Sequence, residues 1–197
     1  MLLGPLWCAA QVGTWKSPPA ITILGAEHDA RIPLVHEAVE FWNAAFADAG
    51  TPFRLGSVRV VAGQIPSSDL RTLSGQIVGI GKPVPMPESV AAAPGNLIVA
   101  LSDDDFVSFA ARWPASGKAL AAIKSHRAWP FTLPNVARNV VAHEIGHAIG
   151  LRHNDDPAML MCGRPAPCRP DVFESSTPRM FPLTARDREA LLRLYPR

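Results

Sequence analysis

Residues 143–153 read HEIGHAIGLRH, and the interpretation of the whole chain starts from this string. His143 and His147 are four residues apart, so on a helix both imidazoles project from one face and can reach one ion. Gly150 can adopt the positive-φ conformation that ends a helix, which turns the chain back and brings His153 to the same ion. Three neutral imidazoles with an open fourth position are typical of a catalytic zinc site.

Glu144 adjoins the first of these histidines and is predicted to face the open side of the ion. Zinc lowers the pKa of a bound water toward about 7, and a carboxylate can take the proton of that water as it attacks a carbonyl. The same acid can then deliver the proton to the leaving amine. The alternative is an ordinary amphipathic helix with surface histidines. Only about one random chain in 10⁵ would carry the motif by chance, which argues against this alternative.

Three helices are predicted around this string from apolar periodicity and capping signals. The string lies on a helix over residues 135–149, and a long amphipathic helix is predicted over residues 31–49, with Asp29 as its cap and Gly50 at its end. A last helix begins at Thr184, whose spacing to Asp187 is that of an N-cap and its N3 acid.

Short apolar runs predict strands at residues 20–24, 53–61, 76–80, 96–101 and 119–124. The order of strand, helix, several strands, helix, loop and helix is typical of an α+β domain with an active-site cleft. A chain of 197 residues is about the size of one domain. We therefore expect an N-terminal arm over residues 1–19 and one catalytic domain over residues 20–197, with the cleft near residue 150.

Composition excludes several other classes of protein. Apolar residues make up 48% of the chain and charged residues 18%, which is typical of a folded protein and not of a disordered one. The net charge of +2 arises from 19 basic and 17 acidic residues without a basic run, so no nucleic-acid partner is expected. No uncharged apolar run reaches the roughly 18 residues of a membrane span. We expect a monomer.

The chain start and the cysteines bear on the cellular compartment. Residues 2–10 (LLGPLWCAA) are apolar and end in small residues, as the tail of a secretory signal does, but the basic leading segment is missing and an apolar arm packed on the domain is the alternative. Cys162 and Cys168 are six positions apart in a proline-rich loop, which permits one local disulfide in an oxidising compartment. We expect a secreted or periplasmic protein, and a cytoplasmic protein with free thiols stays open.

The string HEIGHAIGLRH resembles the extended zinc-binding motif of the metzincin metallopeptidases, and it is most similar to that of the matrixins. These enzymes carry a methionine turn beneath the zinc, and the resemblance assigns that place to Met161 in DDPAMLMCG. It covers most of residues 20–196, and it places Asp187 where matrixins carry an acid that supports the turn. It implies a twisted, mostly parallel sheet with a long first helix, the zinc-binding helix, and a small C-terminal subdomain over residues 151–197 that ends in a helix.

The resemblance implies a zinc-dependent endopeptidase that acts on protein or peptide substrates, with Glu144 as general base. The substrate would lie extended across the cleft and pair its backbone with an exposed sheet edge. In matrixins the region corresponding to residues 162–182 forms a wall of the main specificity pocket, so a Cys162–Cys168 disulfide would act on substrate choice. Two classes stay open: a zinc-fold binding or regulatory module without turnover, against which Glu144 argues, and a hydrolase of a non-protein amide.

The chain also departs from the family pattern. No segment resembles the PRCG latency motif. We interpret Cys8 as an unpaired apolar residue in preference to a residue with a role in latency. The run Asp103, Asp104 and Asp105 offers at most three of the six to eight oxygens that calcium needs, which favours a solvated loop. Asn154 follows the last histidine and could either orient a ligand imidazole or shape a turn.

Overall fold

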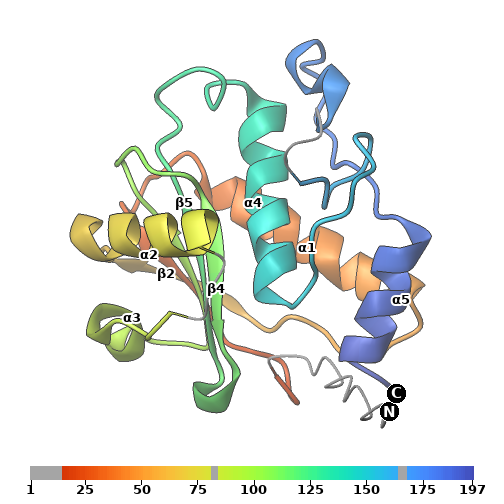
Figure 1. Cartoon of the computed structure of the whole chain (residues 1–197), viewed down its shortest axis with the longest axis horizontal. Helices are drawn as coiled ribbons and strands as arrows, with labels where there is room; N and C mark the ends of the chain where they lie inside the picture. Colours follow the sequence, from red (N-terminus) through yellow and green to blue (C-terminus); the bar gives the residue numbers. More distant parts are fainter. Residues whose placement is uncertain (1–14, 81–83, 164–167) are drawn as a thin grey trace, which may run out of the picture.

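The computed structural model describes residues 15–80, 84–163 and 168–197. A five-stranded sheet lies between the helices (Figure 1). Its strands are in the order β2-β1-β3-β5-β4. The strands are β1 (Ile21–Gly25), β2 (Val58–Ala62), β3 (Leu97–Leu101), β4 (Phe109–Trp113) and β5 (Lys118–Ile123). The first three and β5 run parallel, whereas β4 pairs antiparallel with β5 at one edge. The expected α+β fold with a mostly parallel sheet is confirmed.

Helices cover both faces of this sheet, as Figure 1 shows. They are α1 (Ile32–Asp48), α2 (Ser67–Ile80), α3 (Glu88–Ala92), α4 (Pro134–Ala148) and α5 (Ala185–Leu194), with 3-10 turns at Pro114–Ser116 and Pro170–Phe173. Alternate residues of β3 pack into two different apolar clusters: Leu97 and Val99 toward α1 and α4, Ile98 and Ala100 toward α2 and α3. A strand that is buried on both faces has a continuous apolar sequence. For this reason residues 96–101 (NLIVAL) can be predicted as a strand from the sequence.

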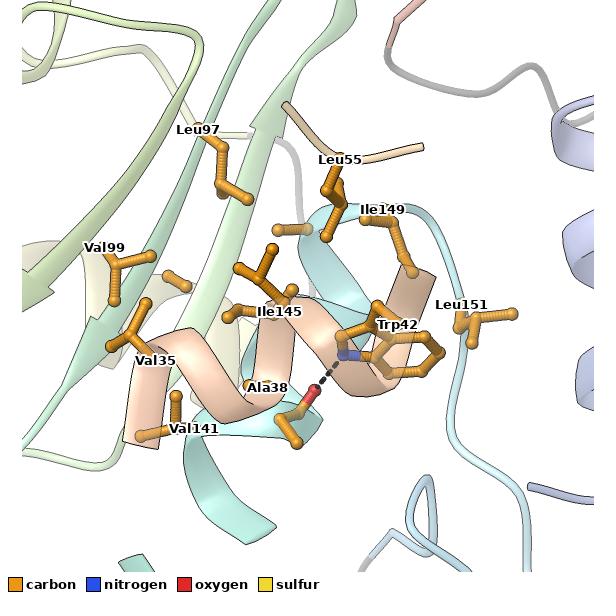
Figure 2. Packing of buried hydrophobic residues seen from close by; sticks show 14 of the residues in the cluster. Val35, Ala38, Trp42, Leu55, Leu97, Val99, Val141, Ile145, Ile149 and Leu151 are labelled. Carbon is orange, nitrogen blue, oxygen red and sulfur yellow. Dashed lines mark hydrogen bonds between the residues drawn. The ribbon is translucent and has the colours of Figure 1, made fainter. Parts of the chain in front are cut away.

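The packing of α1 against α4 sets the position of the histidine-bearing helix. Val35, Ala38 and Trp42 of α1 face Val141 and Ile145 of α4 (Figure 2). The Trp42 side chain is fully buried, and its indole N–H donates a hydrogen bond of 2.9 Å to the carbonyl oxygen of Ala142. A buried indole N–H needs such an acceptor. The bond fixes the position of α4 along α1 at Ala142, one residue before the first histidine.

Arg31 ties the first turn of α1 to the sheet. Its side chain is buried and forms an ion pair of 2.6 Å with Asp29. Its Nη1 donates to the carbonyl oxygens of Ser102, at 2.8 Å, and Lys124, at 2.7 Å, which directly follow β3 and β5. The Asp29 carboxylate accepts from the backbone amide of Arg31 at 2.8 Å and from its guanidinium. Arg31 and not Asp29 is the N-cap residue of α1, and this position has no side-chain capping bond, so the expected cap is wrong.

Several other expectations fail between residues 50 and 115. The predicted strand over residues 76–80 is wrong, because this segment is the end of α2, whose Leu70 and Leu73 are buried at helical spacing against the sheet. The strand predicted over residues 53–61 is reduced to β2, and the strand β4 and the short helix α3 were not predicted. None of the helices within the described residues is long and apolar enough to cross a membrane.

Candidate metal centre

His143 and His147 lie on the last two turns of α4, and the chain turns sharply after that helix. Gly150 adopts a φ of 112°, and the amide of Leu151 donates to the carbonyl oxygen of Gly146 at 3.0 Å. A side chain at position 150 would be strained by this φ and would meet the Arg112 guanidinium at 2.8 Å. This turn returns the chain toward the two histidines.

The three histidines of the string meet at one point. The Nε2 atoms of His143 and His147 are 3.0 Å apart, those of His147 and His153 are 2.9 Å apart, and those of His143 and His153 are 3.2 Å apart. Within the described residues, these three are the one group of histidine, cysteine, aspartate or glutamate side chains arranged to hold a metal ion.

The second ring nitrogens show what the cluster can bind. The Nδ1 atoms of His143 and His147 each donate to a backbone carbonyl oxygen, of Leu160 and Leu151 respectively, at 2.8 Å. Since a carbonyl only accepts, each Nδ1 carries the hydrogen and each Nε2 keeps its lone pair. Two lone pairs that face each other at 3.0 Å repel unless a cation lies between them. The donor set therefore fits a zinc ion.

Burial keeps His143 and His147 in the neutral form that a metal requires, and the more exposed His153 is desolvated in part. Burial lowers the pKa of His147 to about 4, and it lowers the pKa of His143 well below its ordinary value. The pKa of His153 is also lowered, first by burial and then by the charge of Arg169. At neutral pH all three can therefore offer a lone pair without first losing a proton.

Glu144 occupies the position on α4 between the first histidine and Ile145, and only 7% of it is exposed. Burial raises the pKa of its carboxyl to about 8, and the nearby positive charge of Arg169 opposes that rise. A buried carboxyl with a raised pKa is a group suited to hold and return a proton near neutral pH, because its affinity for the proton is closer to that of its reaction partners.

Met161 lies directly against the backbone of α4. It is fully buried, and a Cβ built on Gly146 would approach its Sδ to 2.5 Å. Its carbonyl oxygen accepts from the amide of Asn154 at 2.8 Å, and the Asn154 side chain donates to Asp187 at 2.9 Å. Asp187 also completes the predicted capping box of α5 with Thr184. Asn154 thus shapes the turn, while backbone carbonyls orient His143 and His147.

The loop beyond Met161 brings one further side chain to the centre. Cys162 and Cys168 form the expected disulfide, and Arg169 follows with a φ of 56°, the one positive φ of a non-glycine residue in the described ranges. Arg169 Nη1 donates to Leu160 O at 2.6 Å and lies 3.5 Å from Nδ1 of His143. Sequence reasoning missed Arg169, whose only local signal is that it follows the second cysteine of the loop.

Positive charge gathers around the centre from other elements as well. The pKa of His147 is lowered first by burial, and the charge of Arg112 on β4 adds to this effect. A hollow of about 430 Å³ beside His153 is lined by basic and acidic side chains, namely Arg152, Arg186, Arg193, Asp155 and Asp187. The acidic run at residues 103–105 lies elsewhere and pairs with basic side chains, namely Arg31, Arg71, Lys124 and Arg127. Cys8 and the arm up to residue 14 lie outside the described residues.

Comparison with known proteins agrees with this geometry. A family model described as Matrixin matches residues 110–196, which include the three histidines, Met161 and α5. This segment is therefore similar to metzincin-like metallopeptidases. Zinc is the cofactor that this metzincin-like segment and its three-histidine cluster indicate.

The solved structures that this chain resembles include those of three proteins. Archaemetzincin from Methanopyrus kandleri has 18% identity and a TM-score of 0.49, with 92% of this chain and 97% of that chain covered. Metalloproteinase-II from Bacteroides fragilis has 14% identity and a TM-score of 0.49, with coverage of 95% and 59%. A zinc-dependent peptidase from Methanocorpusculum labreanum has 19% identity and a TM-score of 0.38, with coverage of 87% and 99%. No curated protein matches the chain.

Proposed function

We propose that this chain is a zinc-dependent endopeptidase, in which His143, His147 and His153 hold the ion and Glu144 is the general base and acid. The observation that carries the proposal is the convergence of three Nε2 atoms to within 3.2 Å, with a buried carboxyl beside them. A zinc ion supplies Lewis acidity there, because it polarises a scissile carbonyl and acidifies water.

Glu144 would perform both proton transfers. Its carboxylate takes a proton from the attacking water and returns it to the nitrogen of the leaving amine, so the same oxygen is base and then acid. Arg169 lowers the pKa of Glu144 toward the ionised form that the first transfer needs. Met161 and Gly146 contribute by packing: the buried sulfur supports α4 between its two histidines.

The edge strand β4 is the surface on which we place the substrate backbone. It pairs with β5 on one side only within the sheet and contacts α4. An extended peptide added to this edge would lie along the helix that carries the histidines, and its backbone would gain hydrogen bonds regardless of sequence. Residues 20–197 would then form one catalytic unit, and the disulfide favours an oxidising compartment outside the cytoplasm.

A peptide-library digest of the zinc-loaded chain, with and without a chelator, tests this proposal. We expect cleavage that the chelator abolishes and zinc restores. Glu144→Ala should lower kcat about 10²- to 10⁴-fold and retain zinc, because it removes the proton carrier but no ligand. Glu189→Ala is the matched control, since Glu189 is an exposed partner of Arg193 on α5.

Two outcomes would contradict parts of the proposal. Near wild-type hydrolysis by Glu144→Ala would exclude Glu144 as the base. Absence of any cleavage by the zinc-loaded wild type would exclude endopeptidase activity, and a panel of small non-protein amides would then separate the remaining hydrolase class from a zinc-binding module without turnover.

A further inference from the structure

Arg169 has an environment that differs from that of two buried arginines, Arg31 and Arg138. Arg31 and Arg138 are each paired with a carboxylate, Asp29 and Glu37 respectively. Arg169 is half-buried, and no carboxylate in the described ranges forms an ion pair with it; the charge of Glu144 acts on it only from beyond ion-pair distance. A partly desolvated cation without a close ion-pair partner is costly, and a more distant charge offsets that cost only in part.

The hydrogen bonds of Arg169 leave most of its donors unused within the described residues. Its Nη1 shares the carbonyl oxygen of Leu160 with Nδ1 of His143, and because that Nδ1 is itself a donor, it cannot accept from the guanidinium. A guanidinium has five N–H groups in a planar fork, and Leu160 O occupies one of them. The remaining fork matches the geometry of a carboxylate.

The backbone holds this guanidinium next to the reacting groups. The disulfide fixes the residue before it, the positive φ turns its side chain, and its amide bonds to the carbonyl oxygen of Pro157. Arg169 is close enough to His143, Glu144 and His153 for its charge to influence the pKa of each. Strained backbone that aims a charged side chain at a site is characteristic of functional positions.

We propose that Arg169 is a specificity residue that binds a carboxylate of the substrate close to the scissile bond. This rests on the proposed peptidase function. Two sources share this chemistry, the side chain of an aspartate or glutamate and the free C-terminal carboxylate of a peptide.

Matched peptides measure the selectivity. Starting from a neutral peptide that the enzyme cleaves, each position within three residues of the scissile bond receives Asp or Asn, and a second set compares free-acid with amidated C-termini. We expect the best carboxylate peptide to exceed its amide counterpart about tenfold or more in kcat/KM, because a hydrogen bond between charged groups contributes that much. The set in which the preference occurs identifies the source of the carboxylate.

Variants at position 169 decide whether this residue carries the preference. Arg169→Gln should reduce the carboxylate-to-amide ratio to near one, and Arg169→Lys, which keeps the charge but loses the fork, should leave an intermediate ratio. Arg188→Gln is the control, because Arg188, in the first turn of α5, forms an exposed ion pair with Asp48, the last residue of α1. If Arg169 only orients Leu160 and His143, Arg169→Gln weakens zinc binding and lowers the cleavage rates of the carboxylate and amide peptides by the same factor. The carboxylate-to-amide ratio then stays at its wild-type value, and the inference is wrong.

A binding measurement separates this inference from the proposed function. Calorimetry with zinc-loaded Glu144→Ala, which should bind without cleaving, compares the same peptide pairs with and without Arg169→Gln. Cleavage of neutral peptides with no carboxylate preference overturns the inference and leaves the peptidase intact. Carboxylate-selective binding that depends on Arg169, without cleavage by the wild type, supports the inference and overturns the peptidase. No binding and no cleavage overturn both.

Discussion

Two arginines near opposite ends of the sequence show how the same side chain serves two regions differently. Arg31 is 1% exposed, and its guanidinium is saturated by Asp29 and by carbonyl oxygens at the ends of β3 and β5. Arg169 lies beside the histidines with one strong acceptor, and no carboxylate of the described residues forms an ion pair with it, although the charge of Glu144 acts on it from farther away. The first arrangement stabilises the fold, whereas the second leaves binding capacity for a molecule that arrives later.

The strongest test of this contrast is Arg31→Met. We expect the free energy of unfolding to fall by about 3–5 kcal/mol, because the substitution leaves Asp29 buried without its partner. Zinc content per folded chain should stay unchanged. Urea denaturation with Arg188→Met as control measures it, since that exposed pair should contribute at most about 1 kcal/mol. A loss below the control would mean that Arg31 is not a structural residue of the kind described.

The pH dependence of the same variant sharpens the assignment. Burial raises the pKa of Asp29, but the hydrogen bonds and charge of Arg31 outweigh it and leave the pKa below its ordinary value. The contribution of the Asp29–Arg31 pair to the free energy of unfolding is fully present above the pKa of about 3.9 that Asp29 has in the unfolded chain. It is lost as the pH falls through the pKa that Asp29 has in the folded protein. The difference in stability between wild type and Arg31→Met should therefore narrow below about pH 4.

At the metal centre, His153→Ala should act on the ion and not on the fold. Removal of one of three protein ligands should raise the dissociation constant for zinc by about 100-fold or more. The stability of the metal-free protein should change by at most about 0.5 kcal/mol, because His153 lies at the surface. Competition with a chromogenic chelator measures the affinity. Unchanged zinc affinity would mean that another residue completes the site.

Gly146→Ala tests whether the packing beneath the histidines is as close as the distances indicate. The new methyl group would approach the Met161 Sδ to 2.5 Å and Trp42 to 2.7 Å, so we expect a loss of about 1–3 kcal/mol in unfolding free energy. Gly75→Ala is the control, because a Cβ there meets nothing within 4 Å and α2 should gain stability from alanine. Equal behaviour of the two variants would contradict the packing.

The smallest expected effect is that of replacing Cys162 and Cys168 by serine. A loop this short restricts the unfolded chain little, so the loss of unfolding free energy should be at most about 2 kcal/mol. The main effect should be on the carboxylate-to-amide ratio of kcat/KM, because the disulfide holds the backbone that carries Arg169. Mass spectrometry of the unreduced protein should show the linked peptide. Free thiols at both positions, or unchanged selectivity in the double variant, would argue against this role.

Local sequence signals predicted the parts of the molecule that depend on short-range order. The helices α1, α4 and α5 were predicted to within one or two residues, because their apolar spacing and the Thr184 capping box are local properties. In contrast, α2 was mistaken for a strand at its end, since its short apolar run is decided by which face of the sheet it covers. The edge strand β4 was missed because its half-buried residues lack a clear alternation.

The spacing of HEIGHAIGLRH by itself determined that two imidazoles share one helix face and that Gly150 allows the third to join them, because both are consequences of helix geometry over a few residues. Only the tertiary structure decided which groups surround them. Leu160 became the acceptor for His143, and Arg169 became its neighbour, through contacts with a loop that no local pattern specifies. Charge and hydrogen bonding at the centre depend on distances between segments that the chain brings together when it folds, and periodicity in sequence carries no such information.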